Sequence, residues 1–227
     1  MLIAVEGLPG SGKTTQARLL TEHLNRAGAS AVFLPDNLTR AEDPLGQKLL
    51  QIFDSGDPFA RHGSVIADTF LAAAIRANTF PAFIAPALGD GAVVIEDRGL
   101  HTMYSYSLAT LFQKHDAPAG PAIDWLTAVG ALAGRAADHS LWLRMPPGQA
   151  IQRAERRQGH SYSGEQRVYL HRVHDAYDAL AAADPSLRAV DVTGLAEDQA
   201  HEAVLAVLAA AGSRFRSPCT RPAEEYQ

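Results

Sequence analysis

The sequence predicts an α/β fold in which helices flank a five-stranded parallel sheet. Five short apolar runs, each of the length of a buried strand, alternate along the chain with longer helical patterns. A glycine-rich stretch stands directly between the first apolar run and the first helical pattern, as in a strand–loop–helix unit. The 227 residues and a hydrophobic content of 47% suit one domain. We expect this domain at residues 1–212 and a disordered polar tail at residues 213–227.

Composition and charge exclude several classes of protein. The net charge of -5 argues against a general nucleic-acid binder, which needs a basic excess. The single cysteine, Cys219, allows neither a disulfide framework nor a cysteine metal site. The first strand begins at Leu2, which leaves no room for a signal peptide, and no apolar run looks long enough to span a bilayer. We therefore expect a cytoplasmic protein without a nucleic-acid or membrane partner.

A phosphate-binding loop is predicted at the start of the chain. Residues 7–14 read GLPGSGKT and fit G-x-x-x-x-G-K-[ST] at every fixed position. In such a loop, backbone N–H groups and a helix N-terminus cradle phosphate oxygens. We expect Lys13 to reach the β- and γ-phosphates and the Thr14 hydroxyl to contact Mg²⁺. The alternative is a chance glycine turn, which the complete motif and its setting disfavour. The expected phosphate-binding residues are Gly7, Gly10, Ser11, Gly12, Lys13, Thr14 and Thr15.

The next elements have simple patterns. The spacing of apolar residues predicts a helix at residues 13–26, a buried strand at 31–34 and helices at 45–53 and 65–80. A turn at residues 35–37 follows the second strand, at the sheet edge where ligands bind in open α/β folds. Arg76 lies among apolar neighbours in the last of these helices, so it is either a buried functional group or a surface residue.

The third strand, at residues 92–95, precedes Glu96, Asp97 and Arg98. A carboxylate at this position is typical of the Walker B site, where it holds Mg²⁺ or its water. The planar guanidinium of Arg98 could bind a second phosphate. The alternative is an exposed ion pair after a strand. Asp97 and Thr14 are accordingly the candidate metal ligands.

The second half of the chain completes the alternation. We expect helices at residues 102–112 and 124–133, a strand at 139–143, a helix from Pro146, a helix at 168–183, a strand at 189–192 and a final helix at 196–211. Arg153, Arg156 and Arg157 share one helix face and lead into a polar, glycine-bounded segment. We predict a lid at about residues 153–164. The alternative is a solvated basic face.

Four stretches together resemble the thymidylate kinases, over about residues 1–208. They are the segment EGLPGSGKTTQ at 6–16, the segment VVIEDR at 93–98, the strand and arginine-rich helix at 141–157, and the helix segment at 170–177. The resemblance implies a P-loop kinase fold and transfer of a phosphoryl group from ATP, with Mg²⁺, to a nucleoside monophosphate, usually dTMP. It also implies a homodimer. In the family, the residues that match Lys13, Asp97, Arg98, Arg153 and Arg157 are catalytic.

The resemblance implies substrate contacts by Pro9, Arg76, Arg98, Met103 and Tyr106. Several of these depart from the family pattern. Pro9 stands where the family has an acidic residue facing the acceptor sugar, and Met103 stands where a polar residue binds the base. Ala72 replaces an aromatic that stacks on thymine, and His160-Ser161 replace an Asp-Arg pair of the lid. Losing groups that read the base and sugar loosens or redirects the choice of acceptor, so we expect dTMP or a related, modified nucleotide.

Two other functions stay open. A nucleoside kinase would share the phosphate-binding loop and the acidic-Arg pair, but it needs a general base for a 5′-hydroxyl, and Glu6 or Asp97 is the candidate. A catalytically weakened ATP-binding protein is the second alternative. The complete set of Lys13, Thr14, Asp97 and Arg98 argues against it.

Overall fold

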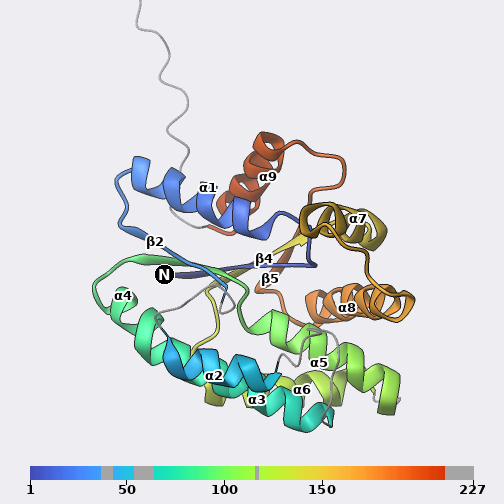
Figure 1. Ribbon diagram of the computed structural model, residues 1–227. Helices are drawn as coiled ribbons and strands as arrows, with labels where there is room; N and C mark the ends of the chain where they lie inside the picture. Colours follow the sequence, from blue (N-terminus) through green and yellow to red (C-terminus); the bar gives the residue numbers. More distant parts are fainter. Residues whose placement is uncertain (37–42, 54–63, 116–117, 213–227) are drawn as a thin grey trace, which may run out of the picture.

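The structure, a computed structural model, describes residues 1–36, 43–53, 64–115 and 118–212 (Figure 1). Its centre is a sheet of five parallel strands in the order β2-β3-β1-β4-β5. The inner strands β1 and β3 are buried along their whole length, because helices cover both faces of the sheet. The strands are β1 (Leu2–Glu6), β2 (Ala31–Leu34), β3 (Val93–Asp97), β4 (His139–Arg144) and β5 (Leu187–Asp191).

Two groups of helices sandwich the sheet. Helices α1 and α9 pack on one face, and α5 and α8 lie on the other with α3 and α6 beyond them (Figure 1). The tail at residues 213–227 lies outside the described residues. The helices are α1 (Lys13–Arg26), α2 (Pro44–Phe53), α3 (Val65–Thr79), the π-helical turn η2 (Phe80–Ile84), α4 (Ala85–Gly89), α5 (Leu100–His115), α6 (Ala119–Ala133), α7 (Pro147–Gln158), α8 (Gly164–Ala183) and α9 (Glu197–Ala210).

The predicted α/β architecture is confirmed, and the differences lie at element ends. The third strand includes Glu96 and Asp97, which the sequence pattern placed just after it. Helix α6 begins at Ala119, five residues earlier than predicted. Helix α8 begins four residues early, at Gly164, because Ser163 and Gln166 form a capping box that satisfies free N–H groups at its start.

The helix predicted at 65–80 continues through η2 and α4 as one run of 25 residues, Val65–Gly89. The prolines do not stop it: Pro81 and Pro86 stand at the starts of η2 and α4, where the helical hydrogen-bond pattern of the run changes. By length and composition this run could cross a membrane, so the expectation that no run is long enough was wrong. Here its first part packs against α2, α5 and α6.

The register of the sheet brings the ends of three strands to one edge. Val5 of β1 pairs with Asp97 of β3, and Glu6 pairs with Trp142 of β4. Asp36 follows the end of β2, the neighbour of β3. Since parallel strands present their carboxyl ends together, the polar residues that follow them meet here.

Candidate active site

The glycine-rich loop connects β1 to α1 in the predicted setting. Gly10 and Gly12 have φ angles of 85° and 93°, which only glycine adopts easily. A Cβ atom at Gly10 would lie 2.1 Å from the carbonyl oxygen of Ala150, so helix α7 packs directly on the loop. Glycine at position 10 is therefore required both by its backbone angle and by this close approach.

Lys13 lies inside the loop with 6% of its surface exposed. Its Nζ donates a hydrogen bond to the Leu8 carbonyl at 2.8 Å. Burial and the nearby Arg98 charge lower the pKa of Lys13 to about 7, although Asp97, Asp36 and Glu6 act in the opposite direction. The Lys13 ammonium group therefore loses its proton easily without a ligand, and the negative charge of a bound polyphosphate would stabilise its protonated form.

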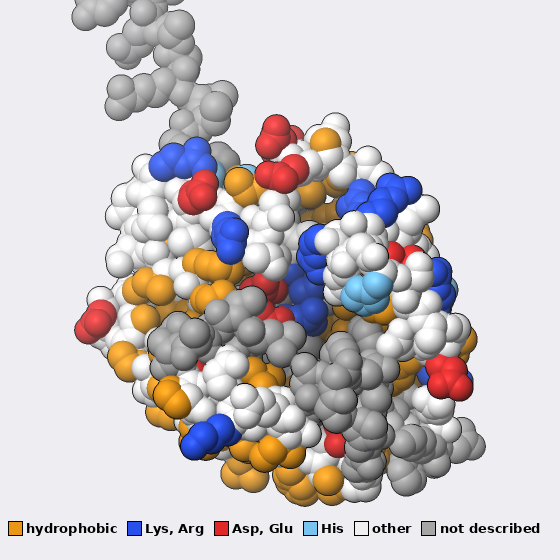
Figure 2. Space-filling view, viewed as in Figure 1, with side chains coloured by type: hydrophobic (Ala, Val, Ile, Leu, Met, Phe, Trp, Pro, Cys, Tyr) orange, Lys and Arg blue, Asp and Glu red, His pale blue; other side chains and the backbone are white. Residues whose placement is uncertain are grey.

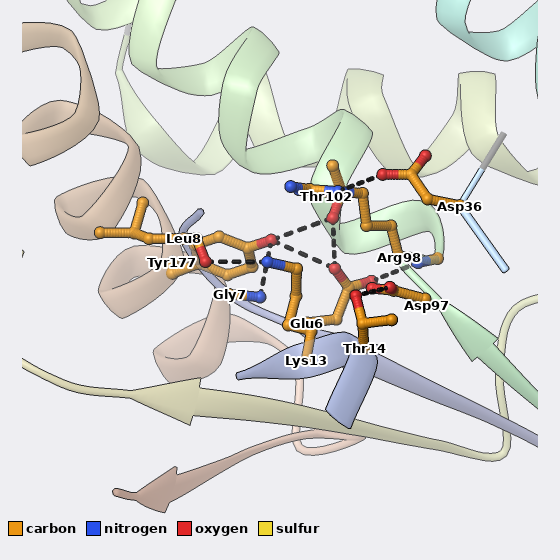
Figure 3. Close-up of polar contacts among 11 residues, drawn as sticks. Glu6, Gly7, Leu8, Lys13, Thr14, Asp36, Asp97, Arg98, Thr102 and Tyr177 are labelled. Carbon is orange, nitrogen blue, oxygen red and sulfur yellow. Dashed lines mark hydrogen bonds and ion pairs between the residues drawn. The ribbon is translucent and has the colours of Figure 1, made fainter. Parts of the chain in front are cut away.

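Thr14 and Asp97 meet beside the loop. The Thr14 hydroxyl donates a hydrogen bond to Asp97 Oδ2, while Asp97 Oδ1 is buried and has no hydrogen-bond partner among the described residues (Figure 3). The Ser11 hydroxyl is likewise buried without a partner there. Buried polar atoms of this kind are costly unless something binds them. A hydroxyl next to a carboxylate oxygen is a donor set that fits Mg²⁺.

Arg98 follows Asp97 and is the only non-glycine residue with a positive φ among the described residues, at 74°. Its Nε donates to Asp36 Oδ2 at 2.8 Å, and each side chain is 22% exposed. Burial lowers the pKa of Arg98, but Asp36, Tyr106, Asp97 and Tyr177 together outweigh it and raise that pKa above its ordinary value. The sequence reading missed Asp36 as a partner of Arg98. Its place after the second strand was the available signal.

A buried network surrounds Glu6, which is fully buried at the end of β1 (Figure 3). The carboxylate of Glu6 accepts hydrogen bonds from Gly99 N at 2.9 Å, from the Thr102 hydroxyl at 2.5 Å and from the Tyr177 hydroxyl at 3.1 Å. The Tyr177 hydroxyl in turn accepts a hydrogen bond from Gly7 N at 3.3 Å. With these donors in place, Glu6 is a poor candidate for the general base considered above.

Arg76 is buried, so it is not the surface residue that the sequence left as an alternative. Its guanidinium forms a two-pronged ion pair with Glu96, in which the side chains are 10% and 2% exposed. Arg76 also donates to the carbonyl oxygen of Arg135 at 3.3 Å. Each guanidinium faces its own carboxylate in this structure, Arg76 facing Glu96 and Arg98 facing Asp36, and the acceptor contact expected of Arg76 stays a prediction. Glu96, which balances the Arg76 charge, was not recognised from the sequence.

The other expected acceptor residues differ in accessibility. Tyr106 is half-buried, packs edge-to-face on Tyr169 and lies close enough to influence the pKa of Arg98. Met103 is 9% exposed and belongs to the hydrophobic core, and Pro9 is buried. Tyr106 is the most accessible of the three.

The arginine-bearing helix α7 borders the loop through Ala150 and Ala154. Arg153, Arg156 and Arg157 are exposed on it, as the predicted shared face requires. Basic and acidic side chains gather in a hollow near the middle of the face seen in Figure 2. An arginine side chain on α7 has a short path to a phosphate bound in the loop, because α7 and the loop touch.

The segment that follows α7 is partly anchored. Tyr162 is 6% exposed, and its N–H donates to Glu155 Oε1 at 2.8 Å. Glu155 also pairs with Arg167 of α8 at 2.6 Å. His160 and Ser161, which precede Tyr162, are exposed. In this structure the segment expected to form the lid is therefore anchored at Glu155 and Tyr162 and exposed at residues 160–161.

Comparison with known proteins identifies the family. The family model described as thymidylate kinase matches residues 5–204. A thymidylate kinase of Synechococcus sp. (strain JA-2-3B'a(2-13)) is 34% identical over 188 residues, which are 82% of this chain and 82% of that protein. The thymidylate kinase of Symbiobacterium thermophilum is 29% identical over 98% of this chain and 99% of that protein.

Solved structures agree on the fold. The crystal structure of thymidylate kinase from Ehrlichia chaffeensis matches with a TM-score of 0.65 at 20% identity, over 92% of this chain and 98% of that one. The family model covers most of the chain, and the two relatives match over 82% and 99% of their own lengths. This chain therefore belongs to the thymidylate kinase family and is a nucleotide kinase.

Proposed function

We propose that the protein transfers the γ-phosphoryl group of ATP to the phosphate of dTMP, or of a closely related nucleotide, to form the diphosphate. The observation that carries this proposal is the cluster of Lys13, Thr14, Asp97 and Arg98 at one edge of the sheet. The relatives named above are thymidylate kinases, which supports dTMP as the first acceptor to test. The acceptor phosphate is itself an anionic nucleophile, so no general base is needed.

The donor phosphates belong in the glycine loop. Gly10, Gly12 and Thr15 would offer backbone N–H groups, while Gly7, whose N–H is bound to the Tyr177 hydroxyl, would shape the loop. The buried Ser11 hydroxyl, which has no partner among the described residues, supports a ligand close to it. Lys13 would leave the Leu8 carbonyl for the β- and γ-phosphates, where its charge offsets the charge of the transferring group.

Thr14 and Asp97 would hold Mg²⁺, through the Thr14 hydroxyl and through Asp97 Oδ1, which has no partner in the described part of the chain. The ion would neutralise phosphate charge and orient the donor. Asp97 lies at the end of a buried strand that pairs with β1, so the position of its carboxylate relative to the loop is fixed by the sheet.

Arg98 is our candidate for the acceptor phosphate. Its guanidinium is already held by Asp36, which fixes its direction. Arg153 and Arg157 would approach the transferred group from α7 when the lid closes. Tyr106 would lie beside the acceptor sugar, and Pro9 and Met103 would border the acceptor as apolar surface.

A homodimer is also part of this proposal. Helix α3 packs against α2 and α6, and apolar side chains remain exposed on all three. Figure 2 shows hydrophobic side chains along this side of the molecule. A contiguous exposed apolar surface is typical of an interface. These residues are Leu45, Ile52, Ile66, Phe70 and Leu132. We place the dimer in the cytoplasm, on the basis of the low cysteine content.

The test is ADP release from Mg-ATP with a panel of nucleoside monophosphates and nucleosides. We expect release with dTMP or a related monophosphate and none with nucleosides. Lys13→Ala should fold and lose turnover by orders of magnitude, whereas Arg26→Ala, at the exposed C-terminal end of α1, should match the wild type. Release with nucleosides alone would establish the nucleoside kinase. ATP binding without any release would establish the weakened ATP-binding protein.

A further inference from the structure

The hydrogen bonds of Glu6 lead in two directions, and the first is toward Arg98. Gly99 and Thr102, which both donate to Glu6, stand at the start of α5, directly after Asp97 and Arg98. A carboxylate is favourable here because the first N–H groups of a helix lack intrahelical partners. A Cβ atom at Gly99 would lie 2.8 Å from Ala4 Cβ, so the chain crosses close over β1. Glu6 therefore fixes where α5 begins, two residues after Arg98.

The second direction is toward the phosphate-binding loop. The Tyr177 hydroxyl, which donates to Glu6, accepts the N–H of Gly7, the first glycine of the loop. Its ring is fully buried and stacked on Trp142, with ring centres 5.5 Å apart. Burial and the Glu6 charge raise the pKa of Tyr177 well above its ordinary value. The hydroxyl thus stays protonated and can donate to Glu6 while it accepts from Gly7.

Thr102 closes the cluster, because its hydroxyl lies 3.2 Å from the Tyr177 hydroxyl as well as bonding Glu6 (Figure 3). One buried carboxylate and two hydroxyls therefore connect the backbone at Gly7 with the backbone at Gly99. These two points border the loop proposed to hold the donor and the turn proposed to hold the acceptor.

We propose that Glu6, Thr102 and Tyr177 are positioning residues that set the distance between the phosphate-binding loop and the Asp97–Arg98 turn without touching substrate. The inference rests on the function proposed above. In phosphoryl transfer the protein contributes mainly alignment and charge, so a small error in this distance reduces turnover more than it reduces binding of either substrate alone.

Two conservative substitutions test the cluster. Tyr177→Phe removes one oxygen and keeps the ring on Trp142, and Thr102→Val removes the other hydroxyl at constant size. We expect each variant to lower the turnover number by at least about tenfold, while each Michaelis constant changes by less than about threefold. The double variant should be little worse than the poorer single variant, since both act through one carboxylate.

The matched control is Thr69→Val in α3. Thr69 is a fully buried threonine whose hydroxyl bonds the Ser107 hydroxyl and the Val65 carbonyl, outside the cluster. We expect it to keep wild-type turnover, even if its thermal midpoint falls. Turnover in Tyr177→Phe and Thr102→Val equal to that of Thr69→Val would overturn the positioning role and leave the proposed kinase function standing. A wild-type protein that turns over no monophosphate would remove the function itself, whatever the variants do.

Glu6→Gln separates positioning from base catalysis. A glutamine keeps a carbonyl oxygen for Gly99 N, and its amide can donate to the two hydroxyls, so the cluster survives without the charge. We expect turnover within about tenfold of wild type and an unchanged pH profile of turnover. A fall of about a hundredfold or more with loss of the acidic limb of that profile would assign a general base instead. That outcome would overturn the proposal.

Discussion

For the substitution Arg76→Met, the sequence and the structure lead to different expected results. Sequence reasoning treats this residue as an acceptor contact, so its loss should raise the acceptor Michaelis constant. In the structure it neutralises Glu96, whose side chain is 2% exposed. Arg76→Met would leave that carboxylate buried without its cation. Breaking a buried pair in this way costs about 3–5 kcal/mol of unfolding free energy.

A double variant tests whether the unpaired Glu96 charge causes this loss of stability. In Arg76→Met/Glu96→Met both charges are gone, and a buried pair replaced by apolar groups of similar volume is often neutral in stability. We expect the double variant to recover most of the loss. Arg135→Met, which breaks a pair with Asp138 at the surface, is the control and should cost about 0–1 kcal/mol.

The assay is urea unfolding followed by circular dichroism, with thermal unfolding as a second measure. For a domain of this size, about 3–5 kcal/mol corresponds to a fall in thermal midpoint of roughly 6–20 °C. A single variant as stable as the wild type, but with an acceptor Michaelis constant raised tenfold or more, would refute the ion-pair reasoning. It would return Arg76 to the acceptor site.

Three further outcomes follow from the site. At pH 8 Lys13, with its pKa of about 7 in the absence of ligand, is mostly neutral, and bound phosphates raise that pKa. ATP binding should therefore take up about one proton, and ATP affinity should fall as the pH rises. Calorimetry in two buffers with different ionisation enthalpies should detect this uptake for the wild type and not for Lys13→Met. Gly10→Ala should abolish turnover and destabilise the fold, because its Cβ atom would meet the Ala150 carbonyl; wild-type kinetics would show that α7 moves away freely. Limited proteolysis at residues 158–164 should slow at least about tenfold when a bisubstrate dinucleotide is bound, and equal rates would count against a closing lid.

Local patterns made the fold and half of the site predictable. The loop at residues 7–14 and the buried strands depend on neighbours within a few residues, so their residue types reveal them. The charge partners were not predictable. Asp36 is 62 residues from Arg98, and Glu96 is 20 residues from Arg76. Which carboxylate a guanidinium meets depends on the packing of helices on the sheet, and a single sequence carries no pattern for that.

The backbone conformation of Arg98 sets thermal stability against the proposed function of this residue. A left-handed conformation costs an arginine about 1–2 kcal/mol that a glycine would not lose, and its partly exposed pair with Asp36 returns little of that. A thermostabilisation screen that ranks substitutions by melting temperature would thus favour Arg98→Gly, at the very position proposed to hold the acceptor. Engineering of this kinase should select for turnover and heat resistance together, with position 98 held constant.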